Sequence, residues 1–220
     1  MLELGGAVTY ITALAVALRT RKPYFVGIFV ACNLMVFWDW VFNSAWFFNV
    51  SYDERLLALW RVGDVEQPLF AVLAYVGFYS FVFYALAHFA PKLDDRFGAR
   101  QWPILYVVAA VYVLIFESIF VSQGVWEYHQ RDAFKLNGVA WSNAWYNAHL
   151  ILLSYAMMRL LRRWAIPSLA SRLDVGTERF WRDTTIAIAA ISTGFFLAFC
   201  GQLIWYVLAE PWVVDSPRPF

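Results

Sequence analysis

The chain has 220 residues, of which 62% are hydrophobic, 20% are aromatic and only 15% are charged, and its formal net charge is +1. A soluble domain of average composition has about 25% charged residues, so this composition favours a polytopic membrane protein. The small net charge argues against a nucleic-acid partner. Because only short loops separate the hydrophobic runs, we expect a single transmembrane domain over residues 1–220.

Six segments have the length and apolar content of a transmembrane helix, which needs about 20 mostly apolar residues. They cover residues 2–18, 23–47, 57–88, 102–122, 139–161 and 184–208. The first segment is short and contains Gly5 and Gly6, so five to seven spans are compatible with the pattern. The predicted fold is all-α, a polytopic transmembrane helical bundle.

The distribution of Lys and Arg over the loops predicts the orientation of this bundle. Cytoplasmic loops of membrane proteins carry an excess of these residues. When the N-terminus is placed outside, most of them fall in the inner loops. Both termini are therefore predicted to be non-cytoplasmic.

Polar residues of every predicted helix except the first fall at one level, in the outer third of the bilayer. Asp39 lies about eight residues, roughly 12 Å, from the outer end of its helix, and Asn43 is on the same face one turn away. The other residues at this level are Asp64, Glu66, Gln67, Glu117, Trp141, Ser142, Asn143, Asn147, His149 and Gln202. This convergence predicts a polar pocket inside an aromatic-rich bundle.

These residues have alternative interpretations. A carboxylate at membrane depth indicates function by default, whereas Asn and Gln also serve to bond helices together. His149 is about 200° around its helix from Asn147, so it faces away from a pocket that Asn147 faces. The loop over 123–138 is either a solvated loop or a lid, with His129 or Glu127 as a proton donor.

The predicted pocket suits chemistry that begins with a proton. A carboxylic acid in apolar surroundings stays neutral and can donate its proton, and aromatic faces stabilise the resulting cation. These features favour protonation of an alkene or epoxide in an isoprenoid that enters from the bilayer. The chain has no Asp-rich diphosphate motif, and its two cysteines have no metal-binding spacing, so we expect neither a metal nor a cofactor.

One set of motifs resembles a known family. Cys32-Asn33, Trp38-Asp39, then Arg55, Trp60 and Asp64 resemble the pattern of the integral membrane terpene cyclases of meroterpenoid pathways, with Asp in place of the family's Glu. Tyr146-Asn147, followed by LILLSYAMMRLLRR, is similar to a later Gln-Asn segment of the family. The resemblance implies a bundle of about seven helices that protonates a terminal epoxide or alkene and closes rings. It also implies that Asp39 is the acid and Asp64 a second acidic position.

A second resemblance leads to a different acid. Phe116-Glu117, the His-containing loop and the helix with Asn143 and Asn147 look similar to the sterol isomerase and sigma-2 receptor superfamily. Under this resemblance Glu117 carries the proton and the product is an isomerised double bond. A third possibility is a non-enzymatic protein that binds or transports a lipid.

The leading hypothesis is a membrane-embedded terpene cyclase whose partners are membrane lipids and a lipophilic isoprenoid substrate. The predicted catalytic residues are Asp39, Glu117 and Asp64. The residues predicted to bind substrate are Trp38, Trp40, Asn43, Trp60, Asn143, Tyr146, Asn147, Gln202 and Trp205.

Overall fold

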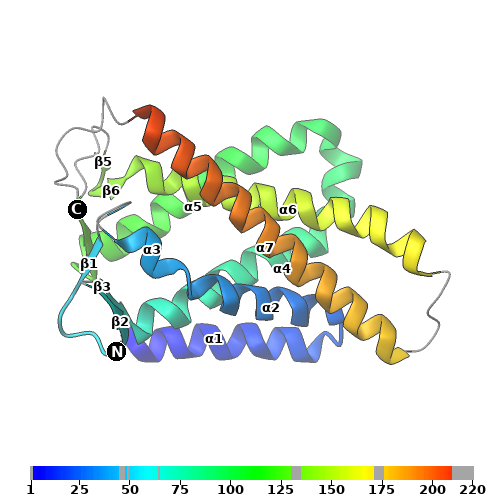
Figure 1. The fold of residues 1–220 in the computed structure, drawn as a ribbon, viewed down its shortest axis with the longest axis horizontal. Coiled ribbons are helices and arrows are strands. Elements are labelled where there is room, and N and C mark those ends of the chain that lie inside the picture. The colour runs from blue at the N-terminus through cyan, green and yellow to red at the C-terminus, as the bar shows by residue number, and fades with distance from the viewer. Residues whose placement is uncertain are drawn as a thin grey trace.

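The computed structural model describes residues 2–44, 48, 50–63, 65–129, 135–170 and 176–209, with backbone only for 162–170, 176–178, 206, 207 and 209. Within these ranges the helices are α1 (Leu2–Arg19), α2 (Pro23–Val36), α3 (Asp39–Asn43), α4 (Leu69–Phe97), α5 (Gln101–Ser122), α6 (Trp141–Ala170) and α7 (Gly176–Ala209). The long helices run back and forth along one axis, so α1 begins and α7 ends at the same end of the bundle (Figure 1).

The helices contain segments that are able to cross a membrane. By length and hydropathy, three segments of the described chain qualify, namely Leu2–Arg19, Leu69–Ser122 and Arg179–Trp205. The second includes both α4 and α5, which are joined by a short 3₁₀ turn at Gly98–Arg100. Helix α2 is apolar but only 14 residues long. The prediction of a mostly helical protein with membrane-crossing segments is therefore confirmed at this level.

The predicted continuous helix over 23–47 is wrong in its second half. Helix α2 ends at Val36, and a turn closed by the Trp38 N–H and the Met35 carbonyl, 2.9 Å apart, precedes the five-residue α3. The turn leaves Phe37 and Trp38 on the outside, whereas Phe42 and Asn43 are buried. The turn between α2 and α3 thus directs the side chains of Phe42 and Asn43 into the bundle.

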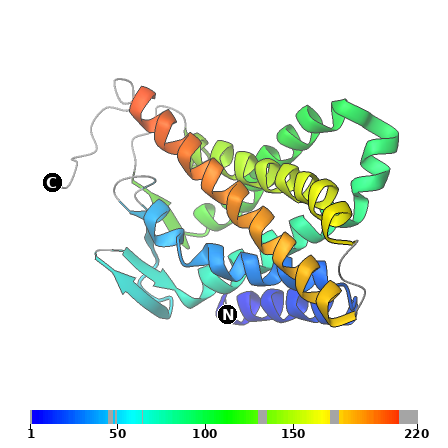
Figure 2. The same cartoon turned by 45° about the vertical axis from the view of Figure 1, so that its right-hand side comes forward.

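The predicted helix over 57–88 is wrong at its beginning. Strands β2 (Ala58–Val62) and β3 (Val65–Pro68) pair as an antiparallel hairpin, and α4 starts only at Leu69. The hairpin turn includes Gly63 with φ +58°, a conformation that glycine adopts without steric cost. Figure 2 shows this hairpin at the same end of the bundle as α3. Glu66 and Gln67 therefore lie in a strand rather than in a helix.

Two further pairs of strands lie at this end, which we call the hairpin end. Strand β1 (Val50–Tyr52) pairs antiparallel with β4 (Trp126–Tyr128), and Ser51 lies opposite Glu127. Strands β5 (Lys135–Leu136) and β6 (Val139–Ala140) form a hairpin, and both residues of its turn, Asn137 and Gly138, have positive φ. The β1–β4 pairing fixes the segment after α3 to the segment after α5.

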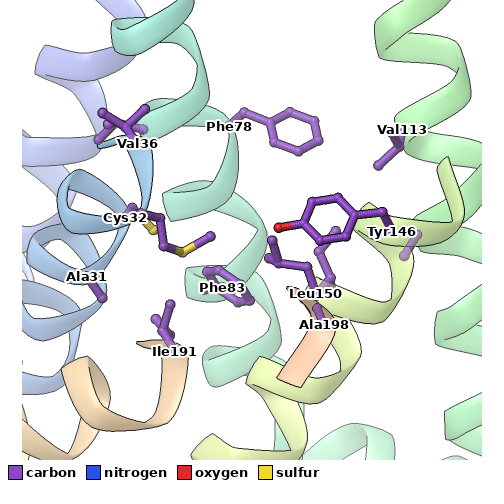
Figure 3. Close-up of a cluster of buried hydrophobic side chains, with 14 of the residues drawn as sticks. Ala31, Cys32, Val36, Phe78, Phe83, Val113, Tyr146, Leu150, Ile191 and Ala198 are labelled. Carbon is purple, nitrogen blue, oxygen red and sulfur yellow. The ribbon is translucent and has the colours of Figure 1, made fainter. Parts of the chain in front are cut away.

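Close helix packing depends on small residues. A Cβ atom at Gly27 of α2 would lie 2.4 Å from the Thr184 carbonyl oxygen of α7, and one at Gly194 of α7 would lie 2.3 Å from the backbone of Ser154 on α6. Such contacts let helix backbones approach closely, as in many membrane bundles. The core formed between α2, α4, α6 and α7 includes Cys32, Phe83, Tyr146, Leu150 and Ile191 (Figure 3).

Candidate functional site

The first half of the candidate site is built around Asp39, the first residue of α3. Its Oδ2 accepts hydrogen bonds from Asn43 Nδ2, at 2.8 Å, and from Gln67 Nε2. Asn43 also donates to the Tyr52 hydroxyl at 2.8 Å. Gln67 is completely buried on β3, so the β2–β3 hairpin supplies a donor that a helix starting at residue 57 would not place here.

The two oxygens of the Asp39 carboxyl group differ in their surroundings. Both amide donors bond to Oδ2, and no donor within the described residues bonds to Oδ1. A proton on Oδ2 would compete with these two N–H groups for the same lone pairs, whereas a proton on Oδ1 would not. The neutral acid therefore carries its proton on Oδ1.

The second half of the site is built around Glu117 on α5, which is 2% exposed. Its Oε2 accepts hydrogen bonds from Trp126 Nε1, at 3.0 Å, and from the Tyr128 hydroxyl, at 2.7 Å. Both donors come from β4, the strand that follows α5. Burial raises the pKa of Tyr128 well above its usual value, so this phenol remains a donor at neutral pH.

A directional chain of hydrogen bonds extends from Glu117 through the bundle. Asn143 Nδ2 donates to the Tyr128 hydroxyl at 2.6 Å, and Asn147 Nδ2 donates to Asn143 Oδ1 at 2.7 Å. The Tyr79 hydroxyl of α4 in turn donates to Asn147 Oδ1. Every donor in the chain points toward Glu117, so this carboxyl group is the terminal acceptor.

A pocket lies between the two halves. About 40 Å³ of it is open to the centre of a water molecule, which is room for about three waters. Asp39 and Asn43 line it from α3, whereas Glu117 does not line it. The complete lining is Cys32, Met35, Val36, Asp39, Phe42, Asn43, Phe48, Tyr75, Tyr79, Tyr128, Asn143, Tyr146, Asn147, Leu150 and Phe195.

Aromatic rings make up much of the pocket wall, and Phe42 is at their centre. Its ring centroid is 4.5 Å from that of Tyr146 and 5.6 Å from that of Phe195, to which it is perpendicular. Phe48 packs on the same ring at 6.5 Å. The wall therefore joins rings from α3, α6, α7 and the segment before β1.

The predicted site residues fall into two groups. Asp39, Asn43, Asn143, Tyr146 and Asn147 line the pocket, and Glu117 is connected to it through Tyr128. Five of the remaining residues are not part of the pocket lining. Trp38 and Trp205 are more than half exposed, Trp60 stacks on Phe37, Trp40 is half-buried, and Gln202 is buried on α7. Asp64 lies outside the described residues.

The histidines His149 and His129 both lie outside the pocket. His149 is on the exposed face of α6, where its ring stacks on Trp145 at 5.8 Å, in agreement with the predicted rotation away from Asn147. His129 Nε2 is 2.5 Å from Ser51 Oγ on the surface of the β1–β4 pair. The central part of the predicted lid, residues 130–134, lies outside the described residues.

Several tyrosine side chains of the site are not among the residues predicted from the sequence, whereas Gln67 was predicted at the level of the pocket without a role in the site. Gln67, Tyr52, Tyr79 and Tyr128 bond the polar groups of the site to one another, although tyrosines in such a chain are expected mainly in packing or at the membrane interface. Tyr79 lies one helical turn from Tyr75, which also lines the pocket, so this spacing on α4 was an available signal.

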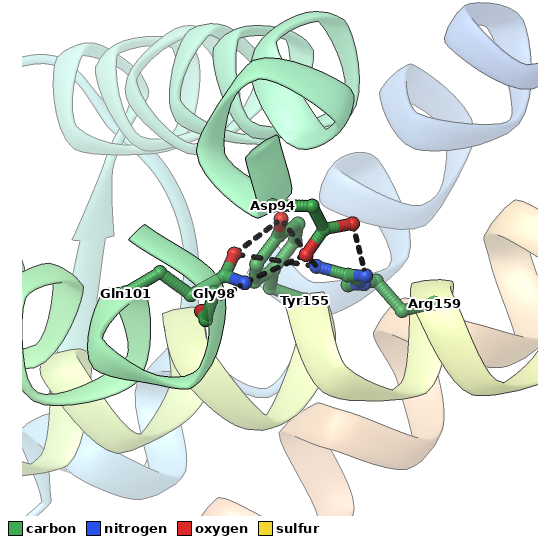
Figure 4. Close-up of polar contacts among 5 residues, drawn as sticks. All are labelled: Asp94, Gly98, Gln101, Tyr155 and Arg159. Atoms are coloured by element: carbon green, nitrogen blue, oxygen red, sulfur yellow. Dashed lines mark hydrogen bonds and ion pairs between the residues drawn. The ribbon is translucent and has the colours of Figure 1, made fainter. Parts of the chain in front are cut away.

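A second cavity, in which about 330 Å³ is open to the centre of a water molecule, lies at the opposite end of the bundle. Its polar wall is a cluster in which Arg159 of α6 contacts Asp94, Gln101 and Tyr155 (Figure 4). Gln101 Nε2 also donates to Asp94 Oδ1 at 2.7 Å and to the Gly98 carbonyl at 2.8 Å. These groups bond to one another across the α4–α5 turn, so the cluster joins α6 to that turn.

Among the residues that the structure describes, no group of three His, Cys, Asp or Glu side chains is arranged to hold a metal ion. In comparisons with known proteins, no family model, no curated protein and no solved structure matches the chain.

Proposed function

We propose that this protein is a membrane-embedded enzyme that protonates an isoprenoid and guides its cyclisation, with Asp39 as the acid. One observation carries the proposal: Asp39, with one oxygen bonded by two amides and the other without a donor among the described residues, lines a pocket walled by aromatic rings. Such a carboxyl group holds a transferable proton in a defined position.

The proposed reaction balances without a co-substrate. Asp39 transfers its proton to a terminal alkene carbon, where the π electrons form the new C–H bond, or to an epoxide oxygen, whose C–O bond then breaks. The resulting carbocation is attacked by a second double bond of the same chain, which forms a C–C bond and moves the positive charge. Loss of a proton from a neighbouring carbon to a carboxylate forms a new double bond and ends the reaction.

The aromatic walls serve the cationic intermediate. Aromatic faces attract a cation without reacting with it as a carboxylate would, and a dry pocket prevents capture of the cation by water. Phe42, Phe48, Tyr146 and Phe195 are positioned for this role around the pocket. An isoprenoid is larger than the space open to water, so its binding requires movement of these rings.

The proposed topology has six membrane crossings. The long helices, with α2 and α3 together making one crossing, alternate in direction, and the loops opposite the hairpin end carry most Lys and Arg. The hairpin end, where α1 begins and α7 ends, then faces the non-cytoplasmic side, and both termini are proposed to lie there. The substrate enters from the bilayer, since an isoprenoid partitions there.

Two other functions receive less support. A double-bond isomerase with Glu117 as acid is disfavoured because Glu117 is outside the pocket lining, whereas Asp39 is part of it. A lipid transporter requires a polar path toward the opposite face, and between the pocket and the Arg159 cluster lie apolar residues such as Phe83, Leu150 and Ile151.

The test uses purified protein in lipid nanodiscs, incubated with linear isoprenoids with and without a terminal epoxide. In deuterium oxide, a cyclisation that begins with protonation of an alkene gives isomers of the substrate that carry one deuterium on carbon. A cyclisation that begins with protonation of an epoxide places the deuterium on a hydroxyl group, where it exchanges, so the epoxide substrate is scored by the cyclised isomer alone. We expect these products from the wild type and from Glu66→Gln, a carboxyl-to-amide control on the exposed hairpin, and not from Asp39→Asn.

Mass spectrometry of the extracted products decides between the assignments. Normal turnover in Asp39→Asn, with loss of turnover in Glu117→Gln, would show that Glu117 and not Asp39 is the acid. Isomeric products of the alkene substrate without deuterium on carbon would exclude protonation of that substrate by either carboxyl group.

A further inference from the structure

The Tyr146 hydroxyl is a buried polar group that faces the pocket. The residue is 4% exposed, and its oxygen has no hydrogen-bond partner among the described residues. Figure 3 shows the hydroxyl pointing from α6 toward α2, on the side where Cys32 lies, and both residues line the pocket. Asp39 lines the same pocket.

Most other polar groups of the pocket already have partners. Asn143, Asn147, Tyr79 and Tyr128 are bonded in the chain that ends at Glu117, and Asn43 is bonded to Asp39 and Tyr52. The hydroxyl of Tyr146 therefore differs from its neighbours. An unpaired buried hydroxyl costs free energy, which a bonded ligand or an ordered water recovers.

We infer that Tyr146 forms a hydrogen bond to an oxygen atom of the ligand, so the pocket selects an oxygenated isoprenoid over a pure hydrocarbon. The inference rests on the proposed function for the isoprenoid nature of the ligand. A hydrocarbon in the same place would leave the phenol buried without a partner and would displace any water that bonded it. An alcohol, ether or carbonyl oxygen at that position satisfies the phenol and fixes the end of the chain near Asp39.

The test compares two probes that differ mainly in one oxygen, farnesol and farnesene. Their binding to protein in nanodiscs is followed by quenching of intrinsic tryptophan fluorescence, with empty nanodiscs as the correction for partitioning into lipid. For the wild type we expect farnesol to bind about three- to tenfold more tightly than farnesene, which is the effect of one hydrogen bond. In Tyr146→Phe the two probes should bind alike.

Tyr106→Phe is a matched control. The Tyr106 hydroxyl is also buried without a described partner, but this residue is outside the pocket lining and packs against Trp145 and His149. The control should keep the wild-type preference for farnesol. An equal preference in Tyr146→Phe and the wild type, or no preference in the wild type, would overturn the inference and indicate that only water bonds the phenol.

The same measurements keep the inference separate from the proposed function. Asp39→Asn removes the acid and retains Tyr146, so it should lose turnover and still prefer farnesol in binding. If no protein forms cyclised products but the Tyr146-dependent preference is present, the cyclase proposal fails and the inference stands. If the wild type forms cyclised products and Tyr146→Phe keeps the preference, only the inference fails.

Discussion

Arg159 on α6 and Asp94 on α4 form a two-pronged ion pair, in which Arg159 Nη1 lies 2.6 Å from Asp94 Oδ1 and Nη2 bonds to Oδ2. The Arg159 side chain is 17% exposed, so solvent screens the pair only in part. Planar guanidinium–carboxylate pairs of this kind are among the stronger hydrogen-bonded contacts in proteins. The pair therefore contributes to the attachment of α6 to the α4–α5 turn.

Replacement of Arg159 should destabilise the fold. Arg159→Met keeps the aliphatic part of the side chain and removes the donors to Asp94, Gln101 and Tyr155, so we expect a loss of about 1–3 kcal/mol in unfolding free energy. The exposed Arg61–Glu66 pair, at 3.5 Å, is the control, and Arg61→Met should change stability by less than about 0.5 kcal/mol. Denaturant unfolding in detergent measures both. Equal losses of unfolding free energy in Arg159→Met and Arg61→Met would contradict a stabilising role of the Arg159 contacts.

The contact of α6 with α7 at Gly194 gives a second prediction. A Cβ there would meet the Ser154 backbone at 2.3 Å, so Gly194→Ala must push the helices apart and should cost about 1–3 kcal/mol. Gly201 lies on the same helix, and no described atom of a neighbouring residue is within 4 Å of the position that a Cβ would take, so Gly201→Ala should stabilise the helix by about 0.5–1 kcal/mol. We expect Gly194→Ala to lower the thermal midpoint and Gly201→Ala to raise it. A gain in stability for Gly194→Ala would show that α6 and α7 pack less closely at this position than the structure indicates.

The bonds to Glu117 predict a difference between two conservative changes. Tyr128→Phe removes one donor to Glu117 and the acceptor of Asn143 Nδ2, all within buried surroundings, and should cost about 1–3 kcal/mol. Glu117→Gln keeps an oxygen that can accept both bonds from β4 and should cost less, about 1 kcal/mol. Unfolding free energies of the two variants provide the measurement, and a larger loss for Glu117→Gln would indicate that its negative charge is needed.

A pH-dependent contribution is expected at the turn after β1. Two kinds of bond from Arg55, one from its side chain and one from its backbone N–H, lower the pKa of Asp53 to about 2. Because the folded pKa is below the unfolded value of about 3.9, the stabilisation is present above about pH 4 and disappears as the pH falls through about 2. The difference in thermal midpoint between the wild type and Asp53→Asn should shrink over this interval. A difference that stays constant from about pH 6 to about pH 2 would exclude this linkage.

The arrangement of the polar residues was predictable where short-range geometry controls it. Asn43 bonds to Asp39 at the i+4 spacing present in the sequence, because both residues lie in α3, after the break that ends α2. Asn143 and Asn147 were predicted at the level of Asp39, since the depth of all three follows from counting residues along helices. Both α5 and α7 enclose the segments predicted for them, 102–122 and 184–208.

Other features depend on contacts between distant segments. The break after Val36 has no Pro or Gly to indicate it, and it follows from the burial of Phe42 among rings of α6 and α7. The Asn137-Gly138 pair is a recognisable hairpin signal that the prediction of helices alone did not use. Whether Asp39 or Glu117 faces the pocket depends on how each helix is rotated about its own axis. The sequence does not specify this rotation, because the hydrophobic segments have polar residues on several faces.

The contact between α2 and α7 has a consequence for the order of assembly. Thr184 Oγ1 donates to the Pro23 carbonyl at 3.1 Å, across 161 positions of sequence, and Phe195 of α7 completes the pocket wall. The ribosome makes α7 after all the other described helices. The partners of Glu117, in contrast, follow it within 11 positions, and Gln67 follows Asp39 by 28. Each carboxyl group therefore acquires its partners soon after it is synthesised, whereas the side of α2 that α7 covers stays uncovered until α7 has been made.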